Sequence, residues 1–292
     1  MWKVGIFLFI KTLNTLDKAI IKSIRELEHV CKTYDKLSGE MFLDNSLNFS
    51  KDIKTTFLAY EDNQLVSLIN IFIPTRYEAE LSAYTHPDYR NRGYFRELQI
   101  SVTSELKKYK VKRILFTCEA QCIVSKDIIK KLGAKYTFTE YSLTYDFNHA
   151  ENKILSSMKL SSPTIDDIPT LISLGEDIFD ENYEESKSIA TKVFNAEDRE
   201  QFLAEVDGNY IGMCSVRFEN NEAMINGLGI SPMYQGEGYG KDLVYSVLNE
   251  LIKRNLKKIA IEVDSDNDKA FNLYQKCGFK IETAFEYYKK NL

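Results

Sequence analysis

At residues 230–240 the chain reads Ile230-Ser231-Pro232-Met233-Tyr234-Gln235-Gly236-Glu237-Gly238-Tyr239-Gly240. A related stretch lies 145 positions earlier and reads Thr85-His86-Pro87-Asp88-Tyr89-Arg90-Asn91-Arg92-Gly93-Tyr94-Phe95. The same offset pairs Ile114 with Ile259 and Gly133 with Gly278, and it needs no insertion from Phe57 to Gly133. A register held over this length indicates a duplicated domain.

The composition is that of an ordinary globular protein with room for two domains. The chain has 292 residues, 44% of them hydrophobic and 28% charged, and a formal net charge of −5. This negative balance argues against nucleic acid as a partner, because such sites need concentrated positive charge. Five cysteines at irregular spacing indicate reduced thiols. Because Cys118 and Cys122 have no second pair of ligands nearby in sequence, we expect no metal site.

The amino-terminal residues superficially resemble a signal peptide. Their apolar run extends only from Val4 to Ile10, and no cleavage site of small residues follows it. We interpret the run as a buried first strand, expect no membrane span, and expect a cytoplasmic protein.

The repeat predicts two tandem domains, at residues 1–147 and 148–292, joined at the polar segment 148–152. Each copy shows the same pattern: an amphipathic helix, a β-hairpin around a polar turn, a strand, a helix, a buried strand and a second helix that ends at a glycine. The predicted ranges are helices at 16–37 and 168–179, hairpins at 56–73 and 202–218, strands at 80–85, 113–118, 223–230 and 258–263, and glycine stops at Gly133 and Gly278. This order predicts an α+β class with a mixed, mostly antiparallel sheet flanked by helices in each domain.

The glycine-rich turn Gln235–Gly240 lies between a predicted strand and a predicted helix. Glycines let the backbone turn tightly and present successive N–H groups, and the helix dipole adds positive potential, so the turn can bind phosphate. A glycine-rich turn without a ligand is the alternative. A dinucleotide fingerprint is disfavoured, because the spacing is G-x-G-x-G and hairpins precede it.

Two motifs together resemble the GNAT superfamily of acyltransferases. Pro232-x-Tyr234-Gln235-x-x-Gly238-x-Gly240 resembles its acyl-CoA pyrophosphate loop, and Asn267-x-x-Ala270-x-x-Leu273-Tyr274-x-x-x-Gly278-Phe279 resembles its second signature. The resemblance covers both copies, strongly in the second and weakly in the first. It implies acetyl-CoA as cosubstrate.

The resemblance implies roles for residues of the second copy. Tyr274 would be the catalytic acid that protonates the leaving thiolate, on the same helix face as Asn267. Asn267 would hydrogen-bond the pantetheine or the tyrosine. The expected cofactor-binding residues are Leu228, Gly229, Ile230, Gln235, Gly236, Glu237, Gly238, Tyr239, Gly240, Lys241 and Asn267. Tyr274 as a mere core aromatic is the alternative. Glu222 and Glu262 are candidates for a base that relays a proton through water, or they are solvated carboxylates.

The first copy lacks several of these residues. Position by position, Tyr274 corresponds to Ile129, Asn267 to Cys122, and Gly240 to Phe95. We therefore expect the first domain to be catalytically silent and to serve as a structural partner, with phosphate binding still possible.

The resemblance thus implies an acetyl-CoA-dependent N-acetyltransferase that acts on a small-molecule or peptide amine by direct attack on the thioester, and we expect a monomer or homodimer. Acidic residues between Glu176 and Glu185 would suit a cationic acceptor, or they form a solvated helix face. The alternative function is a non-catalytic acyl-CoA-binding or regulatory module. The length of the donor's acyl chain stays open.

Overall fold

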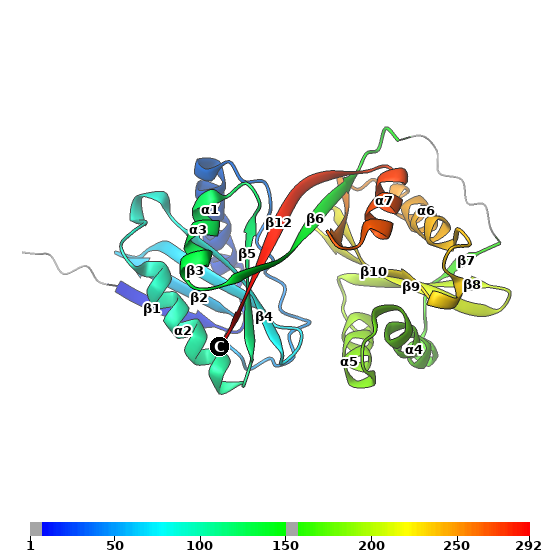
Figure 1. Ribbon diagram of the computed structural model, residues 1–292, viewed down its shortest axis with the longest axis horizontal. Helices are drawn as coiled ribbons and strands as arrows, with labels where there is room; N and C mark the ends of the chain where they lie inside the picture. Colours follow the sequence, from blue (N-terminus) through cyan, green and yellow to red (C-terminus); the bar gives the residue numbers. More distant parts are fainter. Residues whose placement is uncertain (1–7, 150–156) are drawn as a thin grey trace, which may run out of the picture. The chain divides into compact units, whose positions relative to one another are not determined.

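A computed structural model describes residues 8–149 and 157–292 and divides the chain into two compact units. Unit 1 comprises residues 1–139 and 285–292, and unit 2 comprises residues 140–284. The units are drawn in Figure 1. Most of the predicted first strand lies outside the described residues. Its described end forms a strand at the sheet edge, where Phe9 is 53% exposed, so the expected burial is wrong at Phe9.

Unit 1 is a sheet of six strands with helices on both faces. Its elements are β1 (Leu8–Leu13), α1 (Lys18–Asp35), β2 (Thr56–Glu61), β3 (Gln64–Phe72), β4 (Glu78–Thr85), a 3₁₀ turn (Pro87–Tyr89), α2 (Tyr94–Lys108), β5 (Arg113–Glu119) and α3 (Ile123–Lys131). The strand order is β1-β2-β3-β4-β5-β12, and only β4 and β5 pair in parallel.

Unit 2 repeats this arrangement. Its elements are β7 (Lys159–Ser161), a 3₁₀ turn (Ile165–Asp167), α4 (Ile168–Phe179), α5 (Tyr183–Phe194), β8 (Arg199–Val206), β9 (Asn209–Glu219), β10 (Glu222–Ile230), a 3₁₀ turn (Pro232–Tyr234), α6 (Tyr239–Ile252), β11 (Lys258–Asp264) and α7 (Asp268–Lys276). The strand order is β7-β8-β9-β10-β11-β6, with β10 and β11 parallel.

The last strand of each repeat completes the sheet of the other unit. β6 (Lys135–Tyr145) belongs to the first repeat in sequence, yet Glu140 to Thr144 pair with β11 in unit 2. β12 (Phe279–Asn291) belongs to the second repeat, and its residues from Phe285 onward pair with β5 in unit 1. The compact units therefore differ from the expected bounds 1–147 and 148–292, because the two strands are exchanged.

Alternating strand residues divide each unit into two cores. In unit 2, one core joins Ile261 and Val263 to α6 and Tyr274, and a second joins Leu203 and Met213 to α4 and α5. In unit 1, α2 and α3 cover one face and α1 covers the other. Because side chains alternate along a strand, neighbouring residues of one strand face different helices.

The predicted helices, hairpins and strands are confirmed to within a few residues, and the fold class is confirmed. Gly133 and Gly278 follow α3 and α7 with φ of 81° and 95°, the left-handed conformation that favours glycine. Among the described residues, no helix is long and apolar enough to cross a membrane.

Candidate functional site

The parallel strands β10 and β11 separate halfway along their length. They pair from Glu222 with Lys258 to Ile225 with Ile261, and the register ends there. On its other side β10 stays paired with β9 through a bulge between Asn226 and Gly229. Gly227 within the bulge has φ of 53°. A bulge bends and twists its strand, so it turns β10 away from β11 and opens a slot.

The slot is a pocket of about 300 Å³ within unit 2. Its lining residues are Glu140, Phe179, Ile225, Asn226, Gly227, Leu228, Ile261, Glu262, Val263, Asp264, Asn267, Ala270 and Tyr274. The structure thus brings together Tyr274, Asn267, Leu228 and Glu262, four of the residues selected from the sequence. Gly229 and Ile230 are not part of this lining.

Tyr274 and Glu262 reach the slot from opposite faces of the sheet. Tyr274 is 5% exposed and packs in the core that contains Ile261 and Val263. Glu262 lies between these two residues on β11, so its side chain points to the other face, where α4 and α5 lie. A group held in the slot could therefore meet a phenol on one side and a carboxylate on the other.

The phenol of Tyr274 is kept protonated. Burial raises its pKa to about 12, with smaller contributions from Cys214 and Cys277. A thiol has a pKa of about 8.5, so complete proton transfer from this phenol to a thiolate is uphill. Tyr274 is therefore better suited to donate a hydrogen bond to a leaving sulfur than to lose its proton entirely.

Asn267 begins α7 and lines the slot. Its side-chain Oδ1 accepts a hydrogen bond of 3.1 Å from the backbone N–H of Ala270, which is the usual role of an N-cap residue. The amide oxygen is thus used in the cap. The side-chain NH₂ group is the part of Asn267 that could donate a hydrogen bond to a ligand.

The loop after β10 has the conformation of a phosphate cradle. Gly236 and Gly238 have φ of 87° and 92°, and α6 begins directly after Gly238. The first N–H groups of a helix lack intrahelical partners, and together with the helix dipole they attract anions. Gln235 donates a 2.9 Å hydrogen bond from Nε2 to the carbonyl of Ile230, so this side chain ties the loop to the strand.

The packing of the loop leaves room for a side chain at Gly240. A Cβ at this position would meet only Leu273 Cδ2, at 3.5 Å, which is an ordinary contact, and its φ is not positive. Glycine in a helix costs about 0.5–1 kcal/mol relative to alanine. Since neither packing nor backbone conformation requires glycine at position 240, its presence favours an interpretation in which a ligand comes close to the backbone there. Lys241 follows in the same turn, with Nζ 5.3 Å from the Tyr245 ring centroid.

The structure separates the two candidate bases. Glu222 lies at the paired end of β10, opposite Lys258, and is absent from the slot lining. Glu262 lines the slot. Glu262 is an exposed residue, and desolvation of its carboxyl group, followed by the charge of Glu140, raises its pKa to about 7.

The loop of unit 1 has the same backbone conformation as the loop of unit 2. Asn91 and Gly93 have φ of 61° and 93°, which match Gly236 and Gly238. Arg90 replaces Gln235 and donates from Nε to the carbonyl of Thr85 at 3.1 Å, the counterpart of the Gln235 bond. The cradle geometry therefore survives in the first copy.

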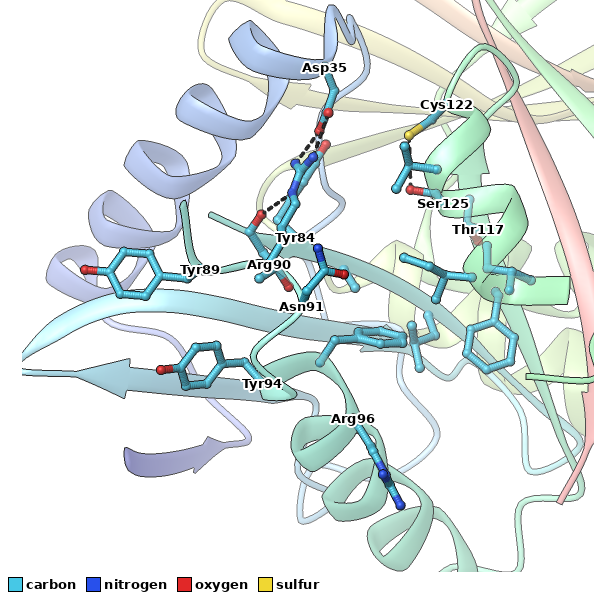
Figure 2. A pocket seen from close by; sticks show the side chains of 18 of the residues that line it. Asp35, Tyr84, Tyr89, Arg90, Asn91, Tyr94, Arg96, Thr117, Cys122 and Ser125 are labelled. Atoms are coloured by element: carbon cyan, nitrogen blue, oxygen red, sulfur yellow. Dashed lines mark hydrogen bonds and ion pairs between the residues drawn. The ribbon is translucent and has the colours of Figure 1, made fainter. Parts of the chain in front are cut away.

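Figure 2 shows the corresponding cleft of unit 1, about 340 Å³ in volume. Phe95 and Ile129 line it, at the positions of Gly240 and Tyr274. Thr117 occupies the position of Glu262, and its Oγ1 is buried without a hydrogen-bond partner. Cys122 replaces Asn267, and its Sγ lies 3.1 Å from Ser125 Oγ. At the positions of Tyr274 and Glu262 this cleft therefore has neither a phenol nor a carboxylate.

Sequence reasoning missed Glu140, Asn226, Phe179 and Asp264. The alternating pattern of residues 135–145 predicts a strand, but local sequence does not reveal that this strand pairs with β11.

All five cysteines are free and buried. Within the described part of the chain, no three metal-ligating side chains of His, Cys, Asp or Glu gather into a potential metal site.

Comparisons with known proteins agree with the fold of the two units. A family model described as the acetyltransferase (GNAT) family matches residues 21–133 and 168–279. An acetyltransferase of Yersinia pestis is 31% identical over 86 residues, which cover 29% of this chain and 61% of that protein. The chain thus spans less than two thirds of that relative's length.

Two solved structures share the fold along nearly the whole chain. A GCN5-related N-acetyltransferase from Sphaerobacter thermophilus has a TM-score of 0.77 at 13% identity, covering 97% of this chain and 95% of that one. A tandem GNAT protein from the clavulanic acid biosynthesis pathway has a TM-score of 0.75 at 14% identity, covering 98% of both chains. At these identities the likeness concerns the fold alone.

Proposed function

Since the chain belongs to the acetyltransferase (GNAT) family, we propose that it transfers an acetyl group from acetyl-CoA to a primary amine in the slot of unit 2. The observation that carries the proposal is the slot between β10 and β11, which Tyr274 and Glu262 line from opposite faces of the sheet. Bound acetyl-CoA supplies a thioester whose carbonyl carbon the amine attacks directly.

The loop from Gln235 to Lys241 would hold the pyrophosphate. Its glycines present backbone N–H groups, the α6 dipole adds positive potential, and Lys241 contributes a full charge. The strand edge at Leu228, Gly229 and Ile230 would offer backbone groups to the pantetheine arm, since β10 has left β11 at that point. Asn267 would donate its amide N–H to the same arm.

Glu262 would act as the base. A primary amine is mostly protonated at neutral pH, so it must lose a proton before or during attack. A carboxylate whose pKa is about 7 accepts that proton far better than an ordinary glutamate. The C–N bond forms and the C–S bond breaks, and Tyr274 donates a hydrogen bond to the departing sulfur. The second proton of the amine nitrogen passes through water to the thiolate, so that the products are the amide and the free thiol.

Unit 1 would be catalytically silent. It has Thr117 in place of Glu262 and Ile129 in place of Tyr274, so its cleft has no proton-handling side chain at these two positions. The duplication then leaves a single reaction centre per chain. The acceptor would be a small molecule or a peptide.

The test is release of free thiol from acetyl-CoA over a panel of amines. Tyr274→Phe should lower kcat by about 10²-fold or more, because it removes the donor to the leaving group. Tyr245→Phe is the matched control: it is another buried tyrosine of the same core, outside the slot, and should retain activity. Tight CoA binding without turnover on any amine would instead support a non-catalytic acyl-CoA-binding or regulatory module.

A further inference from the structure

Glu140 enters the slot because of the strand exchange. In sequence it belongs to the first repeat, and in the structure it belongs to unit 2, on the part of β6 that pairs with β11. Glu140 lies opposite Asp264, and Ser142 lies opposite Glu262. Directly opposed residues of an antiparallel pair project to the same face, and so do residues two apart on one strand. Glu140 and Glu262 are therefore on one face, and both line the slot.

We propose that Glu140 is a positioning residue for the base Glu262: the first repeat supplies it on the exchanged strand, and its carboxylate sets the charge against which Glu262 must ionise. This inference rests on the proposed function, because it assigns a task to Glu262. Two carboxylates that share a confined site resist simultaneous ionisation, so the second one holds a proton more tightly. Desolvation raises the pKa of Glu262 most, and the charge of Glu140 raises it further.

Other charged groups near Glu262 also influence its ionisation. Arg217 on β9 and Lys258 on β11 favour the ionised carboxylate. Lys258 pairs with Glu282 at 2.5 Å, and Arg217 pairs with Glu219 at 2.9 Å, so each cation has a carboxylate partner of its own. Asp264 on β11 adds negative charge to the slot, and Asn226, Asn267 and Phe179 contribute none. Glu140 is therefore the acidic neighbour from another strand.

The first copy shows the same exchange without the carboxylate pair. Phe285 on β12 lies opposite Glu119, and Tyr287 lies opposite Thr117. Phe285 thus occupies the position of Glu140, and Thr117 that of Glu262. Both carboxylates of the pair are missing in unit 1, as the catalytic phenol is. The acidic residue at the position of Glu140 thus occurs in the unit that also has the proposed base, Glu262.

The deciding measurement is the titration of Glu262 itself, by NMR of the chain carrying ¹³C-labelled glutamate carboxyl groups. The Glu262 signal is assigned by its loss in Glu262→Gln. In Glu140→Gln its midpoint should fall by about half a pH unit or more, since a like charge has been removed. Glu205→Gln, which removes a charge from β8 outside the slot, should leave the midpoint unchanged.

Glu140→Asp is the conservative control in case Glu140→Gln folds poorly. It keeps the negative charge but shortens the side chain by one methylene group. It should lower the midpoint by less than Glu140→Gln does. An unchanged Glu262 midpoint in folded Glu140→Gln protein overturns the inference. The acidic limb of kcat/KM against pH should move with the NMR midpoint, whereas a merely structural role would lower the rate equally at every pH. If no amine is acetylated but the midpoint shifts, the proposed function fails and the electrostatic role of Glu140 stands.

Discussion

Arg90 holds the carboxylate of Asp35 with two hydrogen bonds, from Nη1 at 2.9 Å and from Nη2 at 2.5 Å. The pair joins the 3₁₀ turn of unit 1 to the end of α1, and its side chains are only 25% and 16% exposed. Gln235, the counterpart of Arg90, makes the equivalent bond to a strand carbonyl but is too short to extend further. The guanidinium is thus used to hold α1 and is not available to bind phosphate.

Replacing Arg90 with glutamine should therefore destabilise the protein. The amide can keep the bond to Thr85, as Gln235 does with Ile230, but Asp35 loses a charged, partly buried partner. We expect a loss of about 2 kcal/mol in the free energy of unfolding, measured by urea denaturation. The double variant with Asp35→Asn should recover part of this loss. Equal stability of Arg90→Gln and the wild type would contradict the structural role.

Gly240→Ala and Gly240→Phe separate stability from ligand binding. Alanine meets only ordinary contacts there and should raise the free energy of unfolding by about 0.5–1 kcal/mol. Phenylalanine, which the first copy carries as Phe95, should obstruct the loop and raise the Kd for CoA by tenfold or more, roughly 1.4 kcal/mol. Urea denaturation measures the free energy of unfolding, and calorimetric titration measures the Kd for CoA. If Gly240→Phe binds CoA as the wild type does, the pyrophosphate does not lie against this turn.

The repeat made much of this fold predictable. The 145-residue offset transfers β5 onto β11 and α3 onto α7 without a shift, because both copies keep the same turns and glycine stops. Tyr274 and Asn267 were selected because they stand in the motif that resembles the second GNAT signature. They lie within and directly before one short helix, where local spacing fixes the shared face. These residues depend on local structure that a sequence expresses directly.

The exchanged strands could not be predicted in this way. The alternating pattern of β6 identifies a strand but not its partner, and a strand that pairs within its own repeat would have the same pattern. The raised pKa of Glu262 was hidden as well. Its largest cause is desolvation of the carboxyl group in the folded protein, and its second is Glu140, which is 122 positions away in sequence and becomes a neighbour only through β6. Long-range pairing, and not local propensity, decides this part of the site.

The number of CoA sites per chain should depend on Phe95. Unit 1 keeps the loop torsions of the phosphate cradle, but Phe95 stands where the loop of unit 2 has Gly240. We expect the wild type to bind one CoA per chain by calorimetric titration, and Phe95→Gly to bind two. Ile100→Gly removes an exposed apolar side chain elsewhere on α2 and should leave the stoichiometry at one. A second wild-type site would mean that Phe95 does not block the cradle.

The stability of unit 2 should reveal the ionisation of Glu262 even without a substrate. Its pKa is about 7 in the folded protein against an ordinary value of 4.5, so folding favours the protonated form. This contribution is fully present below about pH 4.5 and is lost as the pH rises through 7, where the folded protein must hold the charge. Glu262→Gln resembles the protonated carboxyl and should escape that loss. The Tm of Glu262→Gln minus that of the wild type should thus grow between pH 4.5 and 7 and level off above it, whereas Glu205→Gln should show no such rise. A Tm difference that is independent of pH would show that Glu262 ionises in the folded protein as easily as in the unfolded chain.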